Sequence, residues 1–191
     1  MSNLYSRLWR FCRVVSLCTL ALGLDVTSAG AQTFSPPKSI SSAVSNSAYP
    51  AMAVDALGHI HIAWIDSAVG ITVASSTDGQ TFLTGGIVPG SLGATFQPQM
   101  VVDSTGNIIE IAWAKPSATS TATNQIFDVF VSGSTDGGAT FLPQIPTPVS
   151  TSVKLVSAPR LAFVGAGVGR VFVEGVGGSE LLLRLGGPTG G

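Results

Sequence analysis

The carboxylates with the most distinctive setting lie in two matching segments of the chain. Residues 76–82 read Ser-Thr-Asp-Gly-Gln-Thr-Phe, and residues 134–141 read Ser-Thr-Asp-Gly-Gly-Ala-Thr-Phe. Such an aspartate could serve as a general acid or base, or it could hold a tight turn. We favour the turn, because Asp accepts hydrogen bonds from turn amides and Gly permits left-handed backbone. The residues expected to build the two turns are Ser76, Asp78, Gly79, Thr81 and Phe82, and Ser134, Asp136, Gly137, Gly138, Thr140 and Phe141.

Four other acids lie outside these turns and offer a different chemistry. Asp66, Glu110, Asp128 and Glu174 could supply the two carboxylates of a glycoside hydrolase, which needs only two acids at a set separation. No two of them form a pair that the sequence identifies. We therefore favour acids at strand ends or in solvated loops and predict no catalytic residue.

Two histidines, His59 and His61, alternate with one residue between them. On a strand this spacing places both imidazoles on one face, where they could begin a metal site. A usable site needs a third or fourth ligand, and none is evident. We expect a hydrogen-bonded pair on a strand, with no metal and no other cofactor.

Two tryptophans, Trp64 and Trp113, recur in the same sequence context, Ile-Ala-Trp. An exposed tryptophan could stack against a sugar ring, whereas a repeated one beside isoleucine is typical of a core between sheets. We favour the core.

The first 31 residues read as a secretory leader. Basic residues at positions 7, 10 and 13 precede an apolar run over 14–24, and a small-residue segment ends at Ala31. The apolar run is too short to span a membrane. Both cysteines, Cys12 and Cys18, lie inside this leader, so no disulfide is expected in the exported part. We expect residues 1–31 to be a signal peptide and the protein to be secreted or periplasmic.

The part after the leader is poor in charge. Of 9 Lys and Arg residues three lie in the leader, and of 10 Asp and Glu residues one does, which leaves a net charge near −3 with no cluster of either sign. Nucleic acids and anionic membranes require concentrated positive charge, so neither is expected as a partner. Abundant Gly, Ser and Thr among strand-forming apolar residues predict an all-β fold.

The same part of the chain repeats itself. Residues 49–55 match 97–103, including a Pro, a Met and an Asp, and Ile62-Ala63-Trp64 matches Ile111-Ala112-Trp113. A third copy begins near residue 158, with Gly165 in place of the Asp. This self-similarity divides the part after the leader into units that should share one local structure.

Each repeat reads as four short strands separated by turn residues. The first is expected over 51–54, 60–65, 71–75 and 82–88, and the second over 99–102, 108–114, 126–133 and 141–149. The third is expected over 160–164, 170–174 and 181–185. Thr33-Phe34 precedes Pro50 by the spacing that separates Thr81-Phe82 from Pro98, so residues 34–44 resemble a fourth strand without the other three.

The two Ser-x-Asp-Gly segments resemble the Asp-box, or bacterial neuraminidase repeat, of sialidase-like proteins. The resemblance covers residues 33–185 and implies four-stranded β-propeller blades with the box as the turn between the third and fourth strands. It places that turn away from the central axis where substrates bind. Because the box also occurs in proteins that are not enzymes, it implies a fold more than an activity.

The catalytic residues of sialidases are not matched. Those enzymes resemble one another in three arginines that clamp a carboxylate, a Tyr–Glu pair and an acidic Asp. Here Arg160, Arg170 and Arg184 all lie in the last repeat, and Tyr49 occupies a position that holds Gln97 in the next one.

We therefore expect residues 32–191 to form a partial Asp-box β-propeller, with units over 33–47, 48–90, 94–150 and 157–185. A fragment of a longer propeller is favoured, and the alternatives are a homodimer that completes a six-bladed ring and an open stack of blades with exposed edges. The expected function is an exported, non-catalytic module that binds a glycan or a protein. The alternative is an exo-α-sialidase-type glycoside hydrolase or a piece of one.

Overall fold

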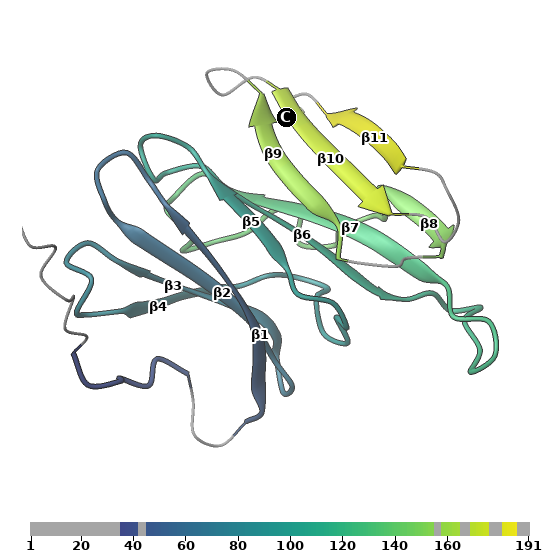
Figure 1. Ribbon diagram of the computed structural model, residues 1–191, viewed down its shortest axis with the longest axis horizontal. Helices are drawn as coiled ribbons and strands as arrows, with labels where there is room; N and C mark the ends of the chain where they lie inside the picture. Colours follow the sequence, from purple (N-terminus) through teal and green to yellow (C-terminus); the bar gives the residue numbers. More distant parts are fainter. Residues whose placement is uncertain (1–34, 42–44, 155–157, 165–168, 176–180, 187–191) are drawn as a thin grey trace, which may run out of the picture. The chain divides into compact units, whose positions relative to one another are not determined.

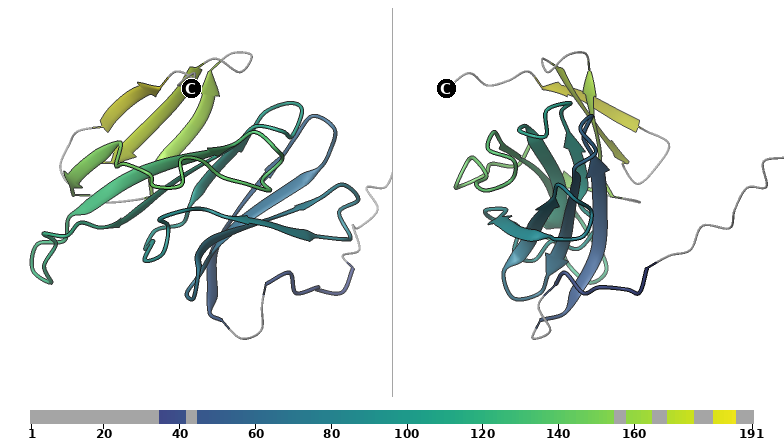
Figure 2. Two further views of the ribbon diagram at one scale, coloured as in Figure 1. Left: turned by 180° about the vertical axis from the view of Figure 1, so that it is seen from behind. Right: turned by 90° about the vertical axis from the view of Figure 1, so that its left-hand side faces the viewer.

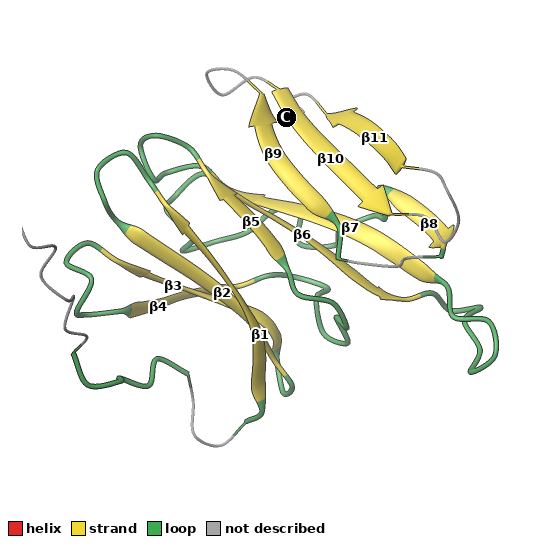
Figure 3. Ribbon diagram, in the orientation of Figure 1, coloured by secondary structure: helices red, strands yellow, loops and turns green. Residues whose placement is uncertain are grey.

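A computed structural model describes residues 35–41, 45–154, 158–164, 169–175 and 181–186. The expected leader over 1–31 lies outside these residues. The chain divides into two compact units, residues 1–38 and 39–191. Of the first unit only residues 35–38 are described, and they are exposed and irregular. The second unit carries eleven strands and no helix in its described part, so the all-β prediction is confirmed (Figure 3).

The first sheet is an antiparallel meander of four strands. β1 (Ser47–Val54), β2 (Ile60–Asp66), β3 (Gly70–Ser76) and β4 (Leu83–Ile87) pair in chain order. The turn from β1 to β2 runs through Gly58, whose φ of 85° lies in the region that favours glycine. All four strands overlap the ranges that the sequence predicted.

The second sheet repeats this order, with one difference from the expected ranges. β5 (Gln99–Val102), β6 (Ile109–Pro116), β7 (Phe127–Ser134) and β8 (Ser150–Val153) again pair in chain order. The fourth strand was expected over 141–149, where only an isolated bridge joins Leu142 to Gly133. Three prolines in that stretch remove the amide donors that a ladder needs, so regular pairing starts only at Ser150.

The third sheet has three strands in the part of the chain that is described. β9 (Arg160–Val164), β10 (Gly169–Gly175) and β11 (Leu181–Gly186) pair in the order β11-β10-β9. The segment expected to supply a fourth strand, residues 34–44, is irregular over 35–40, and residues 34 and 42–44 lie outside the described part.

Successive sheets within the second unit pack face to face (Figures 1 and 2). β5 contacts β1 on one side, and β5 and β6 contact β9 on the other. We name the two sides of a sheet by their residues. The leading face of the first sheet carries Met52, Val54, Ile62, Trp64 and Thr72, and that of the second carries Met100, Val102, Ile111, Trp113 and Phe130. The trailing face of the first sheet carries Ala51, Ala53, Ala63, Ile65 and Val73, and that of the second carries Ala112, Ala114 and Val129.

The hydrophobic core follows from this stacking. The trailing face of the first sheet and the leading face of the second meet in a cluster that includes Ala63, Val73, Ile111 and Trp113. The trailing face of the second sheet forms a smaller cluster with Leu161 on β9. β6 belongs to the sheet that is packed on both faces, and its residues from Ile109 to Ala114 are all buried. The described sheets do not close into a ring.

Candidate functional site

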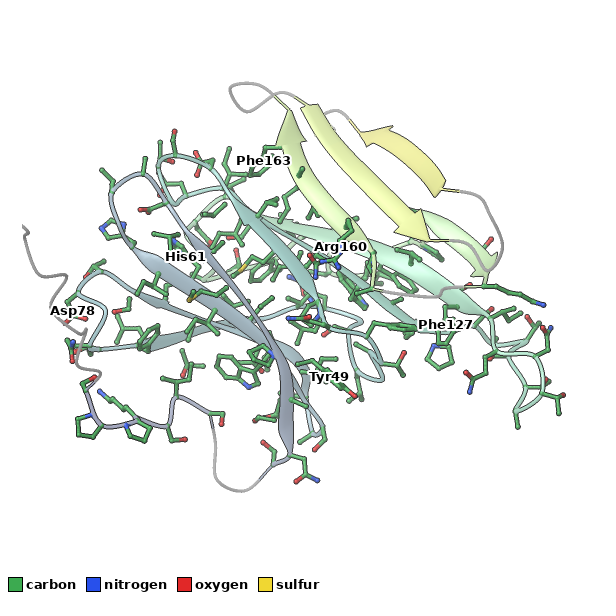
Figure 4. All side chains as sticks on the ribbon, in the orientation of Figure 1. Tyr49, His61, Asp78, Phe127, Arg160 and Phe163 are labelled. Carbon is green, nitrogen blue, oxygen red and sulfur yellow. The ribbon has the colours of Figure 1, made fainter. Side chains whose placement is uncertain are left out.

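The first Ser-x-Asp-Gly segment forms the turn between β3 and β4 (Figure 4). Asp78 Oδ1 accepts hydrogen bonds from the amides of Thr81 at 2.6 Å and Gln80 at 2.7 Å, and from Ser76 Oγ at 2.9 Å. These bonds, first of all that from the Thr81 amide, hold the pKa of Asp78 far below its ordinary value. Gly79 has a φ of 67°, which a residue with a Cβ rarely adopts.

The second segment forms the turn that follows β7. Asp136 accepts hydrogen bonds from the Thr140 hydroxyl at 2.6 Å, the Thr140 amide at 2.9 Å and the Ser134 hydroxyl at 2.7 Å. Together they lower the pKa of Asp136 to about 2, with the Thr140 hydroxyl contributing most. A carboxylate held ionised in this way is a poor proton donor near neutral pH. The two aspartates therefore organise their turns.

A second polar cluster lies where the first and second sheets meet, at the ends of the β1–β2 and β5–β6 turns. Asp55 Oδ1 accepts hydrogen bonds from the amides of Leu57 at 2.8 Å and His59 at 2.9 Å. Burial raises the pKa of Asp55, but these amides and the His59 ring outweigh it and lower the pKa overall. Gly106 of the neighbouring turn packs directly against this carboxylate.

His61 joins the same cluster from β2 (Figure 4). The residue is only 4% exposed, Nδ1 lies 2.9 Å from Ser75 Oγ, and Nε2 lies 3.7 Å from Asp55 Oδ2. Burial lowers the pKa of His61, against the opposing attraction of Asp55, so the ring is neutral near neutral pH. The two histidines converge on Asp55, as His59 Nδ1 is 2.8 Å from its Oδ2.

Ser75, His61 and Asp55 lie in the order of a serine nucleophile, its histidine base and the carboxylate that orients the base. A working relay needs both contacts within hydrogen-bond reach, and the 3.7 Å separation between His61 and Asp55 exceeds it. Nor do the described residues contain three or more His, Cys, Asp or Glu side chains placed to hold a metal ion. The cluster connects the first and second sheets, and its contacts are those of side chains packed between them.

The remaining acids are separated in the structure. Asp66 is buried in the first sheet, where its carboxylate accepts a hydrogen bond from Ser45 Oγ and another from the Ala68 amide at 2.9 Å. Glu110 is buried in the second sheet, on the β6 position that pairs with Gly133, and Asp128 is half-buried on β7. The side chain of Glu174 lies outside the described residues.

The arginines and the tyrosine do not come together in the described part either. Arg160 is exposed and donates to Gln99 Oε1 at 3.3 Å, while Tyr49 is exposed on β1 with a φ of 56°. The side chains of Arg170 and Arg184 lie outside the described residues. Figure 4 shows Tyr49 and Arg160 on different sheets.

The leading face of the first sheet is the most distinctive surface that the structure presents. Met52 is 67% exposed and Val54 is exposed beside it, whereas Met100, at the equivalent place in the second sheet, is 9% exposed. The difference does not come from the residues, which are the same type on equivalent strands. It comes from what lies against them, because the first sheet covers Met100 and no described sheet covers Met52.

Part of this open face is hollowed. A groove of 370 Å³ is lined by Trp64, Asp66, Thr72 and Ile87 of the first sheet and by Ile40 and Ser45 of the preceding chain. Trp64 Nε1 and Thr72 Oγ1 are buried and have no hydrogen-bond partner in the structure. The equivalent Trp113 Nε1, which lies in the core, has no partner in the structure either, so this state follows from burial of the indole.

Sequence reasoning anticipated the Trp64–Trp113 equivalence but not this contrast. Trp113 is fully buried and stacks on Phe130 with ring centroids 5.5 Å apart, as a core residue should. Trp64 has Thr72 in the place of that phenylalanine and lies under the groove. The sequence does contain one signal of this contrast, because the first repeat has Thr72 where the second has Phe130.

Comparisons with known proteins show little. No protein-family model matches the chain, and no curated protein matches it. Among solved structures, an N-acetylgalactosamine deacetylase from F. plautii in complex with blood group B trisaccharide is similar at 16% identity with a TM-score of 0.48. That match covers 76% of this chain and 50% of the deacetylase, so the chain spans about half the length of the protein it resembles.

The described residues include no helix long and apolar enough to cross a membrane.

Proposed function

We propose that the protein is an exported, non-catalytic Asp-box repeat module, built from sheets of the sialidase-like β-propeller type, that binds a protein surface through the leading face of its first sheet. The observation that carries the proposal is the contrast between Met52 and Met100. Two equivalent strands present the same apolar side chain, and one of them is covered by a sheet. The free energy falls when apolar surface of this kind leaves water, so the exposed copy is a binding surface.

A glycan is the second candidate ligand, and the groove beside Trp64 is the observation that favours it. An indole, the Asp66 carboxylate and the hydroxyls of Ser45 and Thr72 border one hollow. Aromatic rings and polar side chains in one pocket suit a sugar with an apolar face and several hydroxyls. The protein surface is favoured because the equivalent tryptophan, Trp113, is covered entirely by protein.

An exo-α-sialidase-type hydrolase is the enzymatic alternative. Incubation with a fluorogenic sialoside tests it, and we expect no release of the fluorophore above the rate without protein. Hydrolysis that is lost in Arg160→Ala and retained in Lys115→Ala would reverse this ranking.

Two measurements test the binding face. An apolar dye such as anilinonaphthalene sulfonate should fluoresce with the wild-type protein, and Met52→Glu should reduce the signal. Leu142→Glu is the matched control, because Leu142 is similarly exposed at 61% but lies beyond β7. A signal that both variants reduce alike would refute the proposed face. Binding on a glycan array that is lost in Trp64→Ala would assign the groove to a saccharide instead.

A further inference from the structure

We propose that the groove beside Trp64 receives an aromatic side chain and a neighbouring cationic side chain of a protein partner, and that Asp66 pairs with the cation. This inference rests on the proposed function, because the groove belongs to the face proposed to bind a protein, and it names the side chains of the partner that enter. It follows from what the second sheet carries at the equivalent place.

The second sheet fills that place with its own side chains. Phe130 lies directly across from Trp113 on the neighbouring strand and stacks on its indole, with ring centroids 5.5 Å apart and planes 14° apart. Lys115 lies two residues after Trp113 on β6, and its Nζ is 4.9 Å from the centroid of the Phe130 ring. The same ammonium group donates to the Gly90 carbonyl at 3.1 Å. An indole, a second ring and an ammonium group are therefore layered on this face.

The first sheet keeps the tryptophan and lacks the other two groups. Thr72 lies across from Trp64, in the register that places Phe130 in the second sheet. Asp66 takes the position of Lys115, two residues after the tryptophan. Trp64, Thr72 and Asp66 all line the groove. The groove therefore lies where the second sheet has a ring and an ammonium group of its own.

The size and the apolar lining of the groove suit an aromatic side chain. Its volume is 370 Å³. An apolar cavity of about 150 Å³ is enough to hold a benzene molecule. Val69 and Ile87 line the groove and are 42% and 49% exposed, so both have apolar surface that an entering ring would cover. The volume leaves room for the ring and for the side chain of a neighbouring residue.

The charge of the groove favours a cation beside that ring. Asp66 is 6% exposed, and its carboxylate accepts hydrogen bonds from Ser45 Oγ and the Ala68 amide. These bonds, first of all that from Ser45, hold the pKa of Asp66 below its ordinary value, so the group is ionised near neutral pH. No Lys, Arg or His in the described part of the chain forms an ion pair with it. An ammonium or guanidinium group that enters with the ring would supply the missing opposite charge.

Capped dipeptides test the inference on the whole chain, with binding followed by NMR shifts of the indole N–H signals. Acetylated and amidated Phe-Lys should bind. Phe-Gln and Ala-Lys each lack one of the two groups, so each should bind roughly five- to tenfold more weakly. Phe-Glu should bind most weakly of the four, because its carboxylate would meet that of Asp66.

Two substitutions locate this binding in the groove. Thr72→Phe should fill the groove as Phe130 fills its equivalent and should abolish binding of Phe-Lys. Thr119→Phe, on the exposed loop between β6 and β7, is the matched control and should leave it unchanged. Asp66→Asn should make Phe-Lys and Phe-Gln bind equally, whereas Asp128→Asn, on β7, should keep the preference for Phe-Lys.

The outcomes separate the inference from the proposed function. Equal binding of Phe-Lys and Phe-Glu, or binding of Phe-Lys that Thr72→Phe leaves unchanged, would overturn the inference. A glycan that binds in the groove while no dipeptide does would overturn it as well. The open face would remain in each case, because the dye signal that Met52→Glu reduces does not depend on the groove. Failure of the dipeptide test and of the dye test together would overturn both.

Discussion

Gly106 and Gly58 are equivalent turn residues with different surroundings, and exchanging each for alanine should separate two costs. The two turns are closed by equivalent hydrogen bonds. The Gly58 amide donates to the Asp55 carbonyl, and the Gly106 amide donates to the Asp103 carbonyl, each at 3.2 Å. Their φ values are 85° and 76°. A Cβ at Gly58 would meet nothing within 4 Å, whereas one at Gly106 would overlap the Asp55 carboxylate and approach His61 Nε2 to 3.4 Å.

The expected magnitudes follow from this difference. Gly58→Ala should lower the free energy of unfolding by about 1–2 kcal/mol, the cost of a left-handed non-glycine residue. Gly106→Ala bears the same cost and adds about 1–3 kcal/mol for overpacking, because Asp55 is tied to two amides and cannot retreat freely. Urea unfolding followed by tryptophan fluorescence should resolve the difference, which amounts to roughly 1 M in the midpoint at a typical m-value.

A double-mutant cycle with Asp55→Ala isolates the contact. Once the carboxylate is removed, Gly106→Ala should cost no more than Gly58→Ala does, and the coupling energy should be about 1–3 kcal/mol. If Gly106→Ala and Gly58→Ala destabilise the wild-type protein equally, the turn of the second sheet does not press on Asp55, and the role assigned to this cluster is refuted.

Three further expectations concern single side chains. His61 is kept neutral by burial, beside Asp55, His59 and Asp103, so the folded state resists protonation while the unfolded state binds a proton below about pH 6.5. The free energy of unfolding should therefore fall as the pH drops below that value, and His61→Gln should remove this slope in urea titrations between pH 7 and 5; equal slopes would contradict the buried neutral ring. The pKa of Asp136 is about 2, so its stabilising effect should be complete above pH 4 and should disappear as the pH falls toward 2. The stability difference between wild type and Asp136→Asn should shrink over that range, and a constant difference would count against the turn hydrogen bonds. Phe141 is 1% exposed, so Phe141→Ala should lower the free energy of unfolding by about 3–5 kcal/mol. Phe82 is half-buried, so Phe82→Ala should lower it by less. A larger loss for Phe82→Ala in thermal unfolding would contradict the packing described for the two turns.

The strands were predictable where local chemistry decides them. β5 and β9 coincide with the expected ranges, because turn residues flank short runs of strand formers. The fourth strand of the second sheet was misplaced, since apolar residues over 141–149 alternate with prolines that cannot donate to a ladder. Regular pairing resumes only where residues with amide donors lie beside β7, and local composition does not reveal that position.

The candidate site was less accessible from the sequence. Met52 and Met100 are equivalent residues in matching segments, so no local pattern distinguishes the exposed one from the buried one. Their difference depends on which sheet neighbours which, a property of the stack. The meeting of His61 with Asp55 and Gly106 is likewise a contact between repeats, and periodicity within one repeat does not predict it.

The edge strand β4 meets the second Ser-x-Asp-Gly turn with no side chain in between. The Gly86 amide donates to the Gly138 carbonyl at 2.7 Å, and a Cβ at Gly85 or Gly86 would lie 2.6 or 2.7 Å from a carbonyl oxygen of that turn. Contact between backbones sets the smallest spacing that two sheets can have at this edge. The glycine pair therefore lets the two sheets approach to backbone contact at this edge, and a bulkier pair would force them apart there.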